Sequence, residues 1–269
     1  MISLAWLPSV PTSRLAPPPR AHAHCHAPHP DPRPHGRYRN PTVRPAWYRR
    51  RQRSLTPAQR RAEAALWPSL GLSWAHARRI DVAAAFGRDA RTVLELGCGT
   101  GEALAALAAA RPAEVFVAVD WYRAGVAAAL QRVDAAGLTN ARLVRGDAAT
   151  LLERALPVAP LFDEVLVFFP DPWRGSEERR ILRQAVVRQL RARMRPGGLL
   201  RIGTDVEDYP SKARAVLTED GGGWREIPCE EYEGPRGGHA RPETYYAREA
   251  ARKENTIHDL CFTIDSDDE

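Results

Sequence analysis

Five carboxylate side chains at the ends of strand-like segments are the residues of this chain best placed to do chemistry. They are Glu95, Asp120, Asp147, Asp171 and Asp205. In open α/β sheets, ligands bind beyond the carboxyl ends of the strands. Gathered carboxylates repel one another and lose hydration, so a fold has no structural reason to collect them there. The set therefore predicts a binding site at this edge of a sheet.

A glycine loop at residues 97–101 follows the first of these strands and narrows the choice of ligand. Gly97, Gly99 and Gly101 allow close backbone approach, which suits either a dinucleotide or S-adenosylmethionine. Glu95 lies two residues before the loop, where it would oppose a diphosphate and favour an ammonium or sulfonium group. Asp120 is placed to accept from ribose hydroxyls. Asp147 is placed to accept from an adenine amino group.

The strand at 162–169 runs into a stiff segment, which we call the proline elbow (residues 169–173). Asp171 stands between two prolines and is followed by Trp173. Each proline fixes φ and removes a backbone donor, so the elbow is expected to be rigid and exposed. It either simply ends a strand or holds a carboxylate and a ring at the rim of a pocket. Trp173 itself either stacks on a base or plugs the loop.

Alternating strands and helices must position these side chains. Strand patterns occupy 92–99, 114–120, 140–147, 162–169 and 197–205, and helical patterns occupy 101–112, 123–137, 179–194 and 209–220. Two further strands, at 224–232 and 255–264, close the chain with little helix between them. The strands are apolar, as parallel strands buried on both faces should be. The pattern predicts a doubly wound, Rossmann-like α/β fold with a mostly parallel seven-stranded sheet and an antiparallel edge strand.

Positive charge is concentrated at the start of the chain. Residues 1–62 carry twelve arginines and one acid, which leaves a net −5 elsewhere out of a total of +6. Residues 1–45 are rich in Pro, His and Arg, so we expect a disordered tail. The domain would span residues 46–269 and begin with a basic helix segment, capped by Thr56. Such an arm usually serves a polyanion, most often nucleic acid.

The composition also excludes several classes of protein. No run approaches the roughly 20 apolar residues of a membrane helix, and the opening makes a poor signal peptide. The four cysteines, Cys25, Cys98, Cys229 and Cys261, contain no CxxC pair and are expected to be reduced thiols of a cytosolic protein. The histidines at 22–29 have no core to fix their geometry, so no built metal site is expected.

Taken together, ELGCGTG, VAVD and RGDA resemble the class I S-adenosylmethionine-dependent methyltransferases. FPDPW, placed after the fourth strand, is similar to the tRNA (guanine-N7-)-methyltransferase family. The likeness extends to RRQRSLTPAQRRAEAALWPSLGL, RAGVAAAL, RPGGLLRIGTDVEDY and RPETYY with IHDL, and so covers roughly residues 47–265. FPDPW combined with TDxEDY is the specific part of the match.

The resemblance implies S-adenosylmethionine as cofactor, tRNA as partner and guanine N7 as methyl acceptor, in a cytoplasmic protein, most simply a monomer, without a membrane partner. It implies that Asp171 is catalytic, accepting from the N1 and N2 hydrogens of guanine. The implied cofactor residues are Glu95, Gly97, Gly99, Gly101, Asp120 and Asp147. The implied substrate residues are Asp205, Thr244, Trp173, Arg179, Arg180 and Arg241.

The chain departs from the family pattern in its substrate half. The run after FPDPW is about two residues shorter, and the family's substrate-contacting lysine falls at or near Gly175. The family's TKFE becomes TYYA at 244–247, without the lysine or the glutamate. Two alternatives therefore stay open: a diverged methyltransferase acting on another RNA or a small nucleobase compound, or a non-catalytic RNA-binding paralogue.

Overall fold

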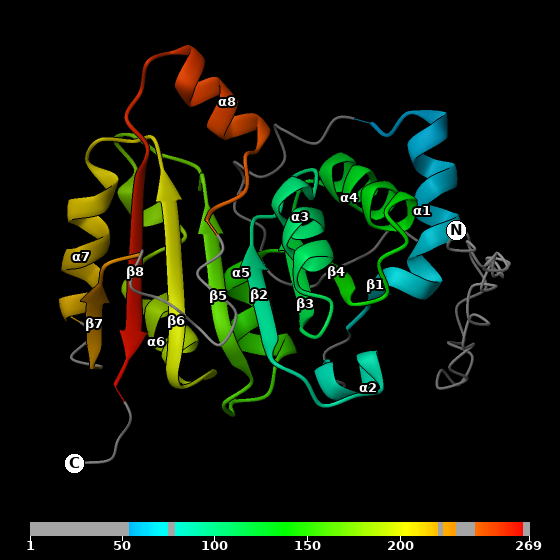
Figure 1. Ribbon diagram of the computed structural model, residues 1–269, viewed down its shortest axis with the longest axis horizontal. Helices are drawn as coiled ribbons and strands as arrows, with labels where there is room; N and C mark the ends of the chain where they lie inside the picture. Colours follow the sequence, from blue (N-terminus) through cyan, green and yellow to red (C-terminus); the bar gives the residue numbers. More distant parts are fainter. Residues whose placement is uncertain (1–53, 75–78, 220–222, 230–239, 266–269) are drawn as a thin grey trace, which may run out of the picture. The chain divides into compact units, whose positions relative to one another are not determined.

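A computed structural model describes residues 54–74, 79–219, 223–229 and 240–265 (Figure 1). All of these residues belong to one compact unit. The expected tail at 1–45 lies outside the described residues, as do Cys25 and the arginines at 49–53.

Helices and strands alternate through most of the described chain. In order, the elements are α1 (Pro57–Leu70), β1 (Gly71–Leu72), α2 (Val82–Phe86), β2 (Thr92–Leu96), α3 (Glu102–Ala110), β3 (Val115–Asp120), α4 (Arg123–Ala135), β4 (Ala141–Arg145), α5 (Ala148–Thr150), the π-helical turn η2 (Leu151–Ala155), β5 (Phe162–Phe168), the 3₁₀ turn η3 (Glu177–Arg179), α6 (Gln184–Arg191), β6 (Met194–Thr204), α7 (Tyr209–Glu219), β7 (Trp224–Ile227), α8 (Tyr245–Arg252) and β8 (His258–Ile264).

The strands form one sheet in the order β1-β4-β3-β2-β5-β6-β8-β7. Pairing is parallel from β1 to β6, whereas β8 runs antiparallel to both of its neighbours. This confirms the expected doubly wound fold with its antiparallel edge. The sheet has one strand more than expected, because β1 is a two-residue ladder too short to leave a periodic pattern in the sequence.

Helices cover both faces of this sheet, and each face has its own apolar core. Side chains alternate between the faces along β2, so Val93 packs with α1, α3 and α4 while Leu94 packs with η2, α6 and α7. Figure 1 shows α3 and α4 on one face, with β2, β5 and β6 running toward the same edge. Between α3 and β2 at this edge lies the glycine loop.

The first helix begins where the sequence predicts. Thr56 accepts from the Gln59 N–H, and the Gln59 side chain accepts from the Thr56 N–H, which is a complete capping box. The buried carboxylate of Glu63 pairs with Arg123 of α4 and Arg145 of β4. These ion pairs fix α1 to the body of the domain.

Two helical expectations differ from the structure. A helix, α8, lies between the last two strands, where little helix was expected, and it buries Ala247 and Ala250. Conversely, the helix expected at 179–194 is shorter and begins only at Gln184, because Arg183 is in an extended conformation. Within the described residues, no helix is both long enough and apolar enough to cross a membrane.

The expectation that the cysteines are all reduced is wrong for two of them. Cys229 and Cys261 form a disulfide, with their Cα atoms 5.3 Å apart. The antiparallel pairing of β7 with β8 places Ile227 opposite Cys261, and Cys229 follows two residues later within bridging range. Cys98 is a free, buried thiol.

Candidate functional site

The glycine loop combines tight packing with an open cradle. All three of its glycines have positive φ, at 86° for Gly97, 54° for Gly99 and 74° for Gly101. A Cβ on Gly101 would come within 2.7 Å of the Ala129 Cβ on α4, whereas nothing lies within 4 Å of a Cβ on Gly97 or Gly99. Gly101 therefore brings α3 and α4 together, and the other two leave space for a ligand against bare backbone.

Asp120, at the end of β3, holds this loop in place. Its Oδ2 accepts from the Gly99 N–H at 2.8 Å, and its Oδ1 accepts from the Tyr122 N–H at 2.6 Å. Burial, with a smaller contribution from the charge of Asp171, raises the pKa of Asp120 to about 6 against the lowering effect of these two hydrogen bonds. A carboxylate here is both a loop anchor and an acceptor for further donors.

Glu95 is the most perturbed acid of the site. It is 3% exposed, and burial followed by the charge of Asp120 raises its pKa to about 8. Its Oε2 is buried and accepts no hydrogen bond from the described part of the chain. A buried acceptor of this kind fits a cationic donor. With the open cradle at Gly97 and Gly99, Glu95 fits the expected cofactor, whose ammonium and sulfonium groups are positive.

Asp147 has a structural contact of its own. Its Oδ1 accepts from the Thr150 N–H and from the Thr150 hydroxyl, both at 2.8 Å, so it caps α5. The side chain is half-buried beyond β4. Asp147 is thus oriented by its cap at the same edge of the sheet as Asp120.

The proline elbow reaches toward the glycine loop. Asp171 is exposed, and its charge raises the pKa of Asp120 and of the buried Tyr209. Phe169 and Trp173 both have positive φ, at 48° and 41°. Such backbone is costly for side chains with a Cβ and concentrates at functional sites. The structure therefore brings Asp171 into electrostatic range of Asp120.

Arg180 ties the elbow to the segment that follows β6. It is 3% exposed, and its Nε donates to the Pro172 carbonyl at 2.8 Å. Its Nη2 lies 3.0 and 2.9 Å from the two carboxylate oxygens of Asp208, and its guanidinium lies 4.9 Å from the centre of the Tyr209 ring. Arg180, predicted as a substrate contact, thus has Nε and Nη2 bound inside the protein, while its buried Nη1 has no hydrogen-bond partner in the described part of the chain.

The other predicted substrate residues border the elbow in different ways. The Arg179 guanidinium lies 5.5 Å from the centre of the Trp173 ring. Asp205 accepts from Asn255 Nδ2 at 2.9 Å. Arg241, whose side chain is 11% exposed, donates to both carboxylate oxygens of Asp259, at 2.7 and 3.2 Å, and lies over Phe169.

Thr244 begins α8, and α8 is fixed to the glycine-loop side of the site. The Thr244 hydroxyl accepts from the Ala247 N–H at 3.3 Å. The Tyr245 N–H donates to Glu102 Oε2, and Arg248 Nη2 lies 3.4 Å from the same carboxylate. Glu102 directly follows Gly101. Figure 1 shows α8 at the end of the sheet toward which β6 points.

Sequence reasoning missed several residues of this site. Glu102 carried a weak signal, as an acid in the first turn of the helix after a glycine loop. Asp208 and Tyr209 belong to the TDVEDY segment of the resemblance, but neither they nor Asn255 carried a signal for their partners, because these contacts join segments far apart along the chain.

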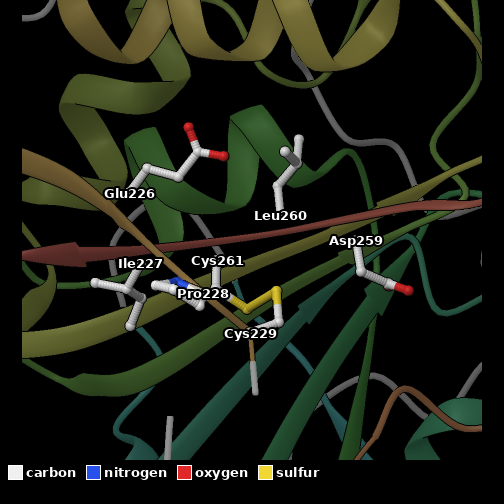
Figure 2. Close-up of a pocket in the computed structure, with 7 residues that line it drawn as sticks. All are labelled: Glu226, Ile227, Pro228, Cys229, Asp259, Leu260 and Cys261. Atoms are coloured by element: carbon white, nitrogen blue, oxygen red, sulfur yellow. A yellow bond between two sulfur atoms is a disulfide. The ribbon is translucent and has the colours of Figure 1, made fainter. Parts of the chain in front are cut away.

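A pocket lies along β7 and β8 beside the disulfide. Figure 2 shows Cys229 joined to Cys261 among the residues that line it. These residues are Glu226, Ile227, Pro228, Cys229, Asp259, Leu260 and Cys261. None of them was predicted as a site residue, although Asp259 is the partner of Arg241.

Comparisons with known proteins agree with this geometry. A family described as putative methyltransferase matches residues 89–260. The tRNA (guanine-N(7)-)-methyltransferase of Nitrosococcus oceani is 39% identical over 175 residues, covering 64% of this chain and 73% of that protein. The protein of the same description from Halorhodospira halophila is 37% identical over 224 residues, covering 81% and 94%.

Solved structures give a more distant match. The 16S rRNA methyltransferase KamB is 20% identical, with a TM-score of 0.46, over 70% of this chain and 96% of that one. This likeness is too remote to inform the chemistry of the site.

Proposed function

Because the chain belongs to the tRNA (guanine-N(7)-)-methyltransferase family, we propose that it transfers a methyl group from S-adenosylmethionine to N7 of a guanine in tRNA. The observation that carries this proposal is that Asp171 lies within electrostatic range of Asp120, whose Oδ2 accepts from the Gly99 N–H of the glycine loop. Asp171 belongs to the elbow, on the side proposed for the methyl acceptor, and Asp120 orders the glycine loop. Their proximity supports a site in which donor and acceptor meet.

The cofactor half would be held by the carboxylates and the loop. When bound, S-adenosylmethionine supplies a methyl group activated by a positive sulfur. Glu95 Oε2 would accept from the ammonium group, and Asp120 would accept from the ribose hydroxyls with its remaining lone pairs. Asp147 would accept from the adenine amino group. Gly97 and Gly99 leave the space that a nucleoside needs.

The acceptor half needs little machinery. Guanine N7 has a lone pair and no proton, so no general base has to act before the N–C bond forms and the C–S bond breaks. What remains is to align N7 and to stabilise the positive charge that develops on the purine. Asp171, accepting from guanine N1–H and N2–H, would do both. The prolines on either side hold its backbone in one conformation.

The remaining predicted residues fall into two roles in this proposal. Asp205, Trp173, Thr244 and Arg179 would border the bound nucleotide. Arg180 and Arg241 would act through the elbow, since one holds the Pro172 carbonyl and the other lies over Phe169. They are positioning residues.

We further propose that the protein acts as a monomer in the cytoplasm, where tRNA is. A disulfide is uncommon in that compartment. The oxidation state of Cys229 and Cys261 in the cell is therefore a measurable part of the proposal.

The test uses purified protein, labelled S-adenosylmethionine and unmodified tRNA transcripts, followed by digestion and identification of the methylated nucleoside. We expect 7-methylguanosine from the wild-type protein and none from Asp171→Ala. Cofactor binding should survive in the variant. Intact cofactor binding by the wild type without methylation of any tRNA would overturn the proposal and favour another acceptor. Salt-sensitive tRNA binding without transfer would favour the RNA-binding alternative.

A further inference from the structure

Three aromatic rings form a partly exposed surface beside the elbow, which we call the aromatic platform (Phe169, Tyr245 and Tyr246). Tyr245 is 53% exposed and Tyr246 is 58% exposed. The Tyr246 ring is stacked with Phe169, with centroids 6.2 Å apart and planes inclined by 25°. The Tyr245 ring meets Tyr246 edge to face, with centroids 5.4 Å apart. Exposed apolar side chains that are gathered rather than scattered singly mark interaction sites.

The backbone that carries these rings is fixed before any ligand arrives. The Tyr245 N–H is bound to Glu102, and Ala247 and Ala250 bury the inner face of α8. Phe169 is fixed from the other side, because its N–H donates to the Gly203 carbonyl at 2.7 Å. A preorganised surface loses little conformational entropy on binding.

We propose that the aromatic platform stacks an unpaired base of the RNA substrate. This inference rests on the proposed function and adds a binding subsite to it. Phe169 is separated from Asp171 only by Pro170, so a strand whose guanine reaches Asp171 passes the platform. Proteins that hold unpaired RNA stack its bases on aromatic side chains, largely without regard to base identity.

The charge on α8 favours RNA over an apolar occupant. Arg248 and Arg252 follow Tyr245 by three and seven residues, so all three share one face of the helix. Arg248 pairs with Glu102 and Arg252 pairs with Glu249, yet their side chains remain 49% and 71% exposed. Cations beside exposed rings match the phosphates and bases of a single strand.

The test compares removal of each ring with its retention. Tyr245→Leu and Tyr246→Leu should raise the KM for tRNA by roughly 5- to 160-fold, the range of base–aromatic stacking. Tyr245→Phe and Tyr246→Phe should recover most of that loss, because they restore the ring. Val158→Ser, which removes an exposed apolar side chain elsewhere, is the matched control and should leave the KM unchanged. The affinity for S-adenosylmethionine should be unaffected throughout.

Binding measurements separate this inference from the proposed function. The Leu variants should lose affinity for a single-stranded oligoribonucleotide more than for a duplex of the same sequence, whether or not the protein methylates it. Equal affinities of the Leu and Phe variants for the single strand would overturn the proposal that the platform stacks a base. So would an unchanged KM in both Leu variants. Because Tyr246→Leu also removes packing on Phe169, Tyr245→Leu decides the matter if Tyr246→Leu unfolds.

Discussion

Arg180 and Asp208 form an ion pair that joins two loops lying 28 residues apart in the chain, with Nη2 3.0 and 2.9 Å from the two carboxylate oxygens. The same guanidinium holds the Pro172 carbonyl through Nε. The position of Asp171 therefore depends on a residue that is itself almost wholly buried.

Replacing Arg180 should slow methyl transfer without weakening cofactor binding. A shift of about 1 Å in a positioned group can cost about 100-fold in rate, so we expect Arg180→Gln to lower kcat at least tenfold. Single-turnover kinetics with tRNA measure the rate of methyl transfer, and calorimetry measures the affinity for S-adenosylmethionine. Arg188→Gln, at an exposed position on α6, is the matched control. A wild-type kcat in a folded Arg180→Gln protein would show that the elbow holds its position without Arg180.

Cofactor affinity should rise with pH up to about 8. The pKa of Glu95 is about 8 in the free protein, and its partner in the proposed complex is a cation, so binding favours the ionised form and releases a proton. The dissociation constant should then fall by up to about tenfold per pH unit below 8 and level off above it. Calorimetry at several pH values measures this. Glu95→Gln should bind more weakly, with a flatter pH profile, and equal profiles would contradict the assignment.

The cofactor-free protein should show the opposite trend in stability. Glu95 has an ordinary pKa of 4.5 when unfolded and about 8 when folded, so between these values the folded state keeps a proton that the unfolded state loses. The free energy of unfolding should therefore fall as pH rises from about 4.5 to about 8, by at most about 1.4 kcal/mol per pH unit from this group. Denaturant unfolding of the wild type and of Glu95→Gln isolates the contribution.

Gly101 and Gly87 allow two costs of adding a Cβ to be separated, the cost of backbone strain and the cost of a collision. Both have positive φ, at 74° and 64°, but only at Gly101 would the added atom collide, 2.7 Å from Ala129. Gly87→Ala should cost about 1 kcal/mol from backbone strain, and Gly101→Ala about 1–3 kcal/mol more, because α3 and α4 must separate. Thermal unfolding measures both. Equal costs would show that the helices adjust freely.

The disulfide should contribute measurably to stability when oxidised. Cys229 and Cys261 are 32 residues apart, and closing a loop of that length is worth about 3–4 kcal/mol in the chain-entropy treatment. Dithiothreitol should lower the melting temperature of the wild type and leave that of Cys229→Ser unchanged. Peptide mapping without reductant should find Cys229 linked to Cys261. Reductant-insensitive melting of the oxidised protein would refute the contribution.

Local sequence patterns predicted most of the sheet, the start of the first helix and the glycine loop. The strands from β2 to β6, the capping box at Thr56 and the glycine loop each follow from neighbouring residues, through periodicity, turn chemistry or side-chain capping. Contacts between distant segments were not predictable in this way. The Arg180–Asp208 pair, the Glu102–Tyr245 contact and the disulfide arise only after the sheet has brought their segments together. α8 was missed because its helical pattern is only eight residues long and follows a loop.

Glu102 begins α3 directly after the glycine loop, and its carboxylate accepts from the backbone of Tyr245 and pairs with Arg248 and Arg132. A cofactor that orders the glycine loop would therefore also order α8, which carries the aromatic platform proposed to bind RNA. Such coupling is reciprocal: if bound cofactor raises the affinity for RNA by some factor, bound RNA raises the affinity for the cofactor by the same factor. Within the proposed function, this carboxylate is where cooperativity between cofactor and RNA would originate.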